Sequence, residues 1–230
     1  MVLERISNRL TGSGLILRGG FRTRPEDRLP VLSGGDAPSS LVLLGNAGPA
    51  LWAAFAAAPE GADGLPHPLN RWTRRLVDEV AADVGAISLY PFDTEPAWPF
   101  QRWALRAEPV HPSPIGLLIH PEFGLWHAYR AALLLGEAVA FPEAAAGPSP
   151  CESCRDRPCL SSCPVGAFTP RRYDVPRCLN HLEAPRGEDC MAQGCRARRA
   201  CPVGVAYRSS PAQAGFHMRA FLAAGRARRH

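Results

Sequence analysis

The segment that decides the organisation of this chain reads CESCRDRPCLSSCPVG at residues 151–166 and CLNHLEAPRGEDCMAQGCRARRACPVG at residues 178–204. It contains all eight cysteines of the 230-residue sequence. The first four follow the spacing C-x2-C-x4-C-x3-C-P, and the last four follow the spacing C-x11-C-x4-C-x5-C-P. Outside the secretory pathway, cysteines gathered in one short segment indicate a metal site and not a framework of disulfides.

The spacing of these cysteines favours iron–sulfur clusters. A [4Fe-4S] cluster needs four thiolates that converge on one small object, and two cysteines two residues apart reach it from a single turn of backbone. A fourth cysteine followed by proline is similar to the bacterial ferredoxin motif, in which this last cysteine binds the other cluster of a pair. The motif Cys-Pro-Val-Gly occurs at residues 163–166 and again at 201–204, which indicates a pseudo-symmetric unit.

We therefore predict two [4Fe-4S] clusters, and at least one, with all eight cysteines as ligands. The ferredoxin-like crossed arrangement assigns one cluster to Cys151, Cys154, Cys159 and Cys201, and the other to Cys163, Cys178, Cys190 and Cys195.

Two departures from the ferredoxin pattern leave alternatives open. Two additional residues precede Cys159, and the second set has no C-x2-C pair. A single cluster with four spare cysteines, or a zinc site built on Cys151 and Cys154, is the alternative. Zinc ribbons normally have two C-x2-C pairs and this chain has one. The C-x3-C-x2-C spacing of radical enzymes is absent, so the clusters are expected to relay electrons.

The composition around the cysteines predicts the domain organisation. The stretch PEAAAGPSP at residues 142–150 is rich in proline and alanine and ends just before the first cysteine, as is typical of a domain boundary. We predict a first domain over 1–142, a ferredoxin-like domain over 148–210, and a C-terminal helix with a basic tail over 211–230.

The first 140 residues alternate helix and strand patterns, which predicts an α/β or α+β fold. An amphipathic helix is predicted over 69–83, ended by Gly85. Residues 126–135 are a helix or a strand, which periodicity does not separate. The other predicted elements are strands at 41–44, 86–90 and 115–119 and helices at 50–58 and 211–224.

The run PIGLLIHPEFGLW at residues 114–126 is the candidate ligand site of the first domain. Gly124 would let a flat ligand approach the backbone, and Phe123 and Trp126 would form an apolar wall. Read without a ligand, His120 is a hydrogen-bonded turn histidine and the aromatic residues belong to the core. Neither GxGxxG nor GxxxxGK[ST] opens a helix here, so nucleotide folds of those two kinds are not expected.

The longer run GLLIHPEFGLWHAYRAALLL, at residues 116–135, resembles the cobalamin-processing proteins of the methylmalonic aciduria type C family. The resemblance implies a nitroreductase-like α+β fold that holds cobalamin base-off and removes its upper ligand. It implies cofactor-binding roles for Gly116, His120, Pro121, Phe123, Gly124, Trp126 and Arg130.

The same region is also similar to epoxyqueuosine reductase, in which a cobalamin domain precedes a two-cluster ferredoxin domain. The matching stretches are FDTEP at 92–96, WALRA at 103–107 and CLNHL at 178–182. The resemblance implies that Asp93 is the proton-donating catalytic acid. Its alternative is an aspartate that caps a turn before Pro96. The D-x-H-x-x-G pattern that ligates cobalt is absent, which implies cobalamin without a protein ligand.

Charge and hydropathy narrow the expected partners and location. The formal net charge is +5, but cluster thiolates would offset the basic excess around the cysteines, so we do not expect nucleic acid as a partner. No run approaches about 18 apolar residues, so no membrane span is expected. Glu4, Arg5 and Arg9 interrupt any apolar run at the start, and we expect a cytoplasmic protein.

These inferences predict an oxidoreductase that passes electrons from iron–sulfur clusters to cobalamin and reductively removes the upper ligand. The electron donor would be a ferredoxin, a flavodoxin or a reductase. One alternative is a cobalamin-dependent reductase of an organic substrate, of the epoxyqueuosine reductase or dehalogenase type. Another is a non-enzymatic electron carrier whose first domain docks a partner protein. Flavin is a further candidate cofactor, because nitroreductase-like folds often hold one.

Overall fold

The computed structural model describes residues 1–142, 147–169 and 172–227. The chain forms two compact units. Unit 1 comprises Met1–Pro109 and His127–Gly147, and unit 2 comprises Val110–Trp126 and Pro148–His230. The domain limits 142 and 148 stay a prediction, because residues 143–146 lie outside the described residues. The compact units divide the chain at two further points, on either side of the segment Val110–Trp126.

Unit 1 is built on a four-stranded antiparallel sheet in the order β1-β2-β6-β3. The strands are β1 (Ile16–Arg22), β2 (Ser40–Ala47), β3 (Ile87–Leu89) and β6 (His127–Leu135). β2 lies at the centre and is buried along nearly its whole length, as its predicted run LVLL requires. The segment whose type the sequence left open is the strand β6, and its second half is fully buried.

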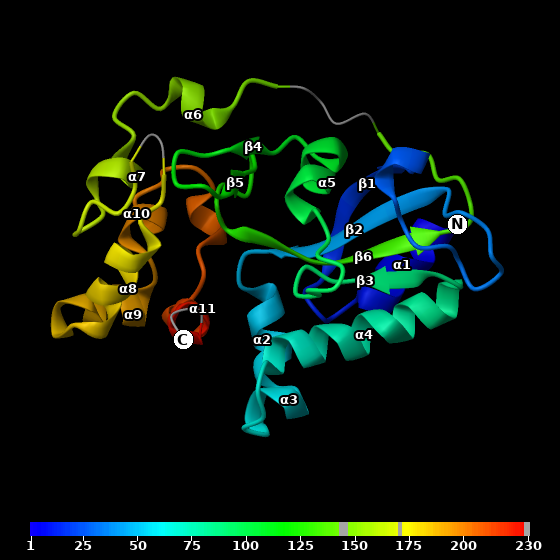
Figure 1. Cartoon of the computed structure of the whole chain (residues 1–230), viewed down its shortest axis with the longest axis horizontal. Helices are drawn as coiled ribbons and strands as arrows, with labels where there is room; N and C mark the ends of the chain where they lie inside the picture. Colours follow the sequence, from blue (N-terminus) through cyan, green and yellow to red (C-terminus); the bar gives the residue numbers. More distant parts are fainter. Residues whose placement is uncertain (143–146, 170–171, 228–230) are drawn as a thin grey trace. The chain divides into compact units, whose positions relative to one another are not determined.

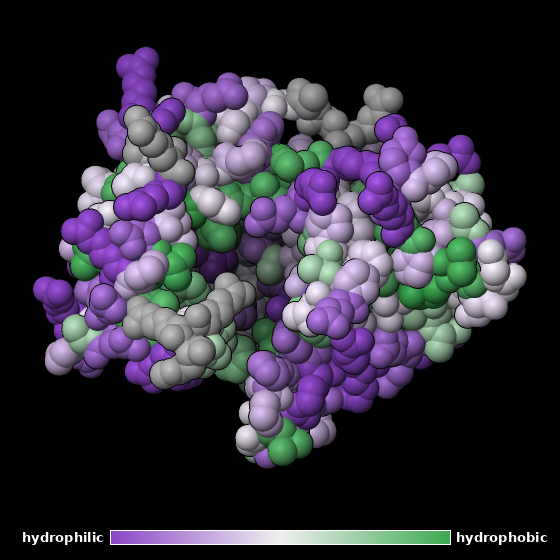
Figure 2. All heavy atoms as spheres, in the orientation of Figure 1, coloured by the Kyte–Doolittle hydropathy of each residue, from purple (hydrophilic) through white to green (hydrophobic). Residues whose placement is uncertain are grey.

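Helices pack against this sheet (Figure 1). The helices in contact with its strands are α1 (Val2–Leu10), α2 (Ala50–Ala56), α4 (Pro68–Val84) and α5 (Phe100–Ala107), and the short helix α3 (Pro59–Ala62) packs against α2 and α4. A 3-10 turn lies at Pro25–Asp27. The prediction for α4 is confirmed, and Gly85 ends the helix with a φ of 68°. Its buried stripe contains Leu69, Trp72, Val77 and Val80. The outward side of α4 is a hydrophilic surface in Figure 2.

Unit 2 consists of short helices and a two-stranded sheet of β4 (His111–Pro112) and β5 (Leu118–Ile119). The predicted strand 115–119 is thus reduced to its last two residues. The helices are α6 (Pro150–Ser153), α7 (Pro158–Ser161), α8 (Val175–Glu183), α9 (Glu188–Gln193), α10 (Arg196–Arg199) and α11 (Pro211–Ala227), with 3-10 turns at Pro185–Gly187 and Val205–Tyr207. The predicted C-terminal helix is confirmed as α11, while residues 228–230 of the predicted tail lie outside the described residues.

The core of unit 2 forms around its cysteines in two apolar clusters. One combines Ile115, Ile119 and Leu125 with Cys201. The other joins α8, α9 and α11 through Leu179, Leu182, Cys190 and Leu222. Segment Val110–Trp126 belongs to unit 2 because its apolar side chains are buried in the first cluster. No helix in the described part of the chain is long and apolar enough to cross a bilayer.

Candidate metal centre: two pockets lined by cysteine

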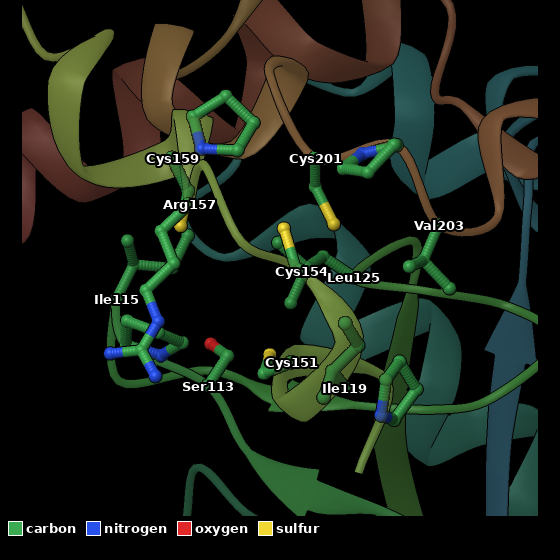
Figure 3. Close-up of a pocket in the computed structure, with 14 residues that line it drawn as sticks. Ser113, Ile115, Ile119, Leu125, Cys151, Cys154, Arg157, Cys159, Cys201 and Val203 are labelled. Carbon is green, nitrogen blue, oxygen red and sulfur yellow. The ribbon is translucent and has the colours of Figure 1, made fainter.

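The first pocket of unit 2 is lined by Cys151, Cys154, Cys159 and Cys201. Figure 3 shows the sulfur atoms of Cys154 and Cys201 turned towards the space that the four side chains surround. Cys151 lies in α6, Cys154 is the C-cap of α6, Cys159 lies in α7, and Cys201 follows α10. Most of the remaining wall is apolar and comes from Ile115, Ile119, Leu125, Val203 and four prolines.

The second pocket is lined by Cys163, Cys178, Cys190 and Cys195. Cys163 follows α7, Cys178 and Cys190 lie within α8 and α9, and Cys195 is the N-cap of α10. The other side chains in its wall are those of Pro164, Val165, Phe168, His181, Leu182, Arg196, Ala197 and Met218.

The structure therefore groups the cysteines in the crossed manner expected from the sequence. Cys201 joins three cysteines from the first motif, and Cys163 joins three from the second. The short helices α7 and α10 pack together, which brings the two halves of the cysteine segment into contact. The grouping is a finding about the side chains, and the binding of clusters to them stays a prediction.

Burial controls the chemistry of these thiols. In the first pocket it raises the pKa of Cys151, Cys159 and Cys201, and neighbouring thiols raise the pKa further. In the second pocket burial raises the pKa of Cys178, Cys190 and Cys195. Burial disfavours the charged thiolate, so these thiols lose their protons only when a positive centre such as a metal ion binds them.

Hydrogen bonds to sulfur provide part of that compensation. The Ala167 N–H donates to the Cys163 sulfur at 3.3 Å. Backbone N–H groups of Arg196 and Val203 lower the pKa of Cys190 and Cys201, against the larger effect of burial. In the second pocket the Tyr173 hydroxyl also hydrogen-bonds the Cys178 sulfur. Hydrogen bonds of this kind are among the factors that set the potentials of iron–sulfur clusters.

The donor set fits an iron–sulfur cluster. A single tetrahedral zinc, with a Zn–S bond of about 2.3 Å, requires its sulfurs to lie about 3.8 Å apart. In the described part of the chain, no three histidine, cysteine, aspartate or glutamate side chains are arranged to hold one metal ion. The four thiols of each set surround a largely apolar pocket, an arrangement suited to a cofactor of several atoms.

The predicted ligand segment 114–126 forms a tight turn beside the first pocket. The Nδ1 atom of His120 accepts hydrogen bonds from the N–H groups of Glu122 and Phe123, at 3.0 and 3.2 Å. The rings of His120 and Phe123 stack with centroids 4.2 Å apart. His120 is thus a hydrogen-bonded turn histidine, as in the alternative interpretation of this segment in which no ligand binds.

Gly124 lies against the second Cys-Pro-Val-Gly motif. A Cβ atom at Gly124 would lie 2.1 Å from the carbonyl oxygen of Val203. The backbone of Val203, next to Cys201, therefore approaches Gly124 as closely as the sequence predicted for a flat ligand. Trp126 is buried, and the Arg198 guanidinium lies 4.8 Å from its ring while donating to the Leu125 carbonyl. Gly116 lies in a turn with a φ of 79° and Pro121 is exposed.

The structure does not bring all the predicted cobalamin residues into one unit. Arg130 lies on β6 of unit 1, whereas Gly116, His120, Pro121, Phe123, Gly124 and Trp126 lie in unit 2. The Arg130 guanidinium donates to the oxygens of Asn70 and Thr73 at 3.2 and 3.3 Å. Its buried Nε has no hydrogen-bond partner among the described residues, and burial lowers the pKa of Arg130 to about 10. The cofactor-binding roles of these residues stay predictions.

Asp93 closes a turn in unit 1. Its Oδ1 accepts a hydrogen bond from Arg74 at 2.7 Å, and its Oδ2 accepts one from the Tyr90 N–H at 3.1 Å. The Arg74 guanidinium also lies 4.1 Å from the Tyr90 ring. This arrangement agrees with the turn-capping alternative, and the proton-donating role stays a prediction.

Two groups of polar residues were missed by the sequence analysis. In unit 1 the buried Arg18 donates to both carboxylate oxygens of Glu108, at 2.7 and 2.6 Å, and the Tyr129 hydroxyl also donates to Glu108. In unit 2 the buried His181 has no hydrogen-bond partner at either ring nitrogen among the described residues. Leaving such a group unpaired costs about 1–3 kcal/mol.

The mixed α+β fold of this chain is that of a class of solved reductases. No protein-family profile matches the sequence, and no curated protein matches it either. Similar solved structures include several of epoxyqueuosine reductase, and in each of these the match covers 92% of this chain and 69% of the other.

Three of these structures illustrate the range of the likeness. One holds an epoxyqueuosine-modified tRNA stem loop, at 17% identity and a TM-score of 0.50. The enzyme from Streptococcus thermophilus has 13% identity and a TM-score of 0.53. That from Bacillus subtilis, with a catalytic aspartate loop swung out of its active site, has 14% identity and a TM-score of 0.53. The predicted similarity to epoxyqueuosine reductase is confirmed for the fold, whereas the nitroreductase-like and ferredoxin-like assignments stay predictions.

Proposed function

We propose that this chain is an oxidoreductase that uses two iron–sulfur clusters and cobalamin to reduce an organic substrate. The observation that carries the proposal is the division of eight thiols into two sets of four around separate pockets. The fold shared with epoxyqueuosine reductase over most of the chain supports it. From the sequence alone, reductive removal of the upper ligand of cobalamin is the first expectation and this function is the alternative.

Segment 114–126 is the reason why reduction of an organic substrate is now favoured over removal of the upper ligand of cobalamin. The resemblance to cobalamin-processing proteins depended on this segment, and most of it packs against the cysteine motif of unit 2. The likeness in fold is to a reductase of an organic substrate. One similar structure was solved with a tRNA stem loop, so a nucleic-acid substrate, which the sequence did not lead us to expect, belongs among the candidates.

The residues of this chain have separate tasks in the proposed reaction. The bound clusters and cobalamin would supply one-electron transfer and a reactive cobalt centre. The eight cysteines would hold the clusters, and the apolar walls formed by Ile115, Ile119 and Leu182 would exclude water from them. Hydrogen bonds from backbone N–H groups to sulfur offset the negative charge of the thiolates.

Asp93 is the proposed proton donor to the substrate. The resemblance to epoxyqueuosine reductase supports this role, and a related structure has a catalytic loop named for an aspartate. Arg74 and the Tyr90 N–H fix the orientation of the Asp93 carboxylate. We expect Asp93→Asn to lower substrate turnover by about 100-fold or more, because general acid catalysis contributes that much. Iron content and cobalamin reduction should be unchanged, and loss of both in this variant would contradict the assignment.

Anaerobic purification followed by analysis for iron, sulfide and zinc tests the first half of the proposal. Two clusters predict about eight iron atoms and about eight sulfides per chain. A colourless protein that contains zinc would overturn the proposal.

Titration of the iron-loaded protein with cob(II)alamin tests the second half. We expect the absorption spectrum to shift to the base-off form and cobalt to be reduced when dithionite is added. Protein that holds clusters but never binds cobalamin would instead be an electron carrier. Release of the upper ligand from cyanocobalamin, without turnover of an epoxyqueuosine-containing stem loop, would restore the processing function.

A further inference from the structure

His181 is a polar side chain without a partner in the interior of unit 2. It lies in α8, where it is 4% exposed, and neither of its ring nitrogens has a hydrogen-bond partner among the described residues. Its neighbours Leu179 and Leu182 belong to an apolar cluster. Buried polar side chains almost always have a partner, so an unpaired imidazole at this position requires an explanation.

The position of His181 explains why its imidazole is unpaired, because the residue lines the second cysteine pocket. His181 follows Cys178 by three residues on the same helix, and side chains at this spacing lie on one face. The other charged residue in this wall, Arg196, forms an ion pair with Asp189 at 3.2 Å. The non-cysteine side chains that remain in the wall are apolar. Among the described residues of this wall, His181 is the one whose buried ring nitrogens have no hydrogen-bond partner.

The imidazole has the chemistry of a donor to sulfur. Burial lowers the pKa of His181, and the charges of Arg186 and Arg196 lower it further. A neutral imidazole carries one N–H group and a protonated one carries two, so the ring can donate in either form. Thiolate and sulfide sulfurs accept such hydrogen bonds, and these bonds stabilise the reduced, more negative state of a cluster more than the oxidised state.

We propose that His181 is a positioning residue that donates a hydrogen bond to a sulfur atom of the cluster held by Cys163, Cys178, Cys190 and Cys195, and thereby raises the reduction potential of that cluster. The inference rests on the proposed function, because it needs a cluster in the second pocket. It goes beyond that function in assigning the control of one potential to one side chain.

A redox titration followed by electron paramagnetic resonance tests this role in the full chain. The variant His181→Phe keeps a planar ring and removes the N–H donor, whereas His181→Gln keeps a donor. In His181→Phe we expect unchanged iron and sulfide content and a lower potential for the second cluster. At a fixed solution potential its ratio of reduced to oxidised form should fall roughly fivefold, as expected for the loss of one hydrogen bond. The first cluster provides an internal reference that should not shift, and His181→Gln should recover part of the change.

A spectroscopic measurement keeps the inference testable if His181→Phe fails to load its second cluster. In the wild-type protein labelled with ¹⁵N-histidine, pulsed resonance spectra of the reduced second cluster should show coupling to one histidine nitrogen and to one exchangeable proton. Absence of that coupling, or an unshifted potential in a fully loaded His181→Phe protein, would overturn the inference while leaving the proposed function intact. Wild-type protein that takes up no iron would refute the proposed function, and the inference would fall with it.

Discussion

The two cysteine pockets of unit 2 share a motif but differ in their walls. Each contains a cysteine followed by Pro-Val-Gly, yet the first pocket is closed by segment Val110–Trp126, which precedes the cysteines by many residues. The second is closed by α8, α9 and α11, which follow the first motif. A repeated motif therefore fixes where thiols gather, while unrelated parts of the chain decide what surrounds them.

The walls also differ in hydrogen-bond donors. The second pocket has the Ala167 N–H on Cys163, the Tyr173 hydroxyl on Cys178, and the unpaired ring of His181. The first pocket has the Val203 N–H on Cys201, the Ser149 hydroxyl on Cys151, and the Ser113 hydroxyl, which has no partner among the described residues. Because donors to sulfur favour the reduced state, we expect the second cluster to be the easier of the two to reduce.

Removal of single cysteines gives the largest expected effect and tests the division into two pockets. Cys159→Ala should abolish the first cluster, and Cys163→Ala, only four residues later, should abolish the second. Each variant should lower the iron content from about eight to about four atoms per chain and remove a different resonance signal. Loss of the same signal in both variants would show that the crossed grouping is wrong.

Gly124→Ala tests the wall of the first pocket alone. The new Cβ would lie 2.1 Å from the Val203 carbonyl oxygen, and the backbone φ is 57°. We expect a loss of about 3 kcal/mol in the free energy of unfolding, together with faster iron release from the first cluster. The measurements are urea denaturation and iron release to a chelator.

Gly116→Ala is the matched control for that variant. Its φ of 79° is also left-handed, but no atom lies within 4 Å of the new Cβ position. The free energy of unfolding should therefore fall by only about 1 kcal/mol, which is the cost of the backbone strain. Equal effects at the two glycines would argue against the contact between Gly124 and Val203.

Tyr173→Phe has the smallest expected effect and tests the difference in donors. It removes the hydroxyl that hydrogen-bonds the Cys178 sulfur and keeps the ring, which stacks on Phe168 with centroids 4.5 Å apart. The potential of the second cluster should fall slightly, with a shift of about twofold in its reduction equilibrium. Tyr207→Phe is the control, because that hydroxyl bonds Glu122 and not a sulfur. A shift in the first cluster, or none in the second, would contradict the expectation.

The sequence predicted features that local spacing determines. The periodicity of α4, its end at Gly85 and the buried strand β2 depend on neighbouring residues, and the structure contains all three. The grouping of the thiols joins cysteines far apart in the chain, and it followed from the resemblance to the ferredoxin motif and not from local spacing.

What the sequence did not predict depends on distant contacts. The strand β1 contains Gly19, Gly20 and the buried Arg18, a composition that argues against a strand until Glu108 is present to pair with the arginine. Likewise, the apolar run 114–126 carries no sign of which unit will bury it. His181 gave no signal, because one histidine in an amphipathic helix has no distinguishing pattern.

Segment Val110–Trp126 also determines how this protein can be divided. The chain leaves unit 1 after Pro109, joins unit 2, and returns as β6 at the centre of the sheet. A fragment that starts at Pro148 would lack Ile115, Ile119 and Leu125, and its first cluster would face water and oxygen. The cysteine segment is thus not an independent domain. Gene fusion or truncation just before it would separate the first cluster from the apolar residues that cover it.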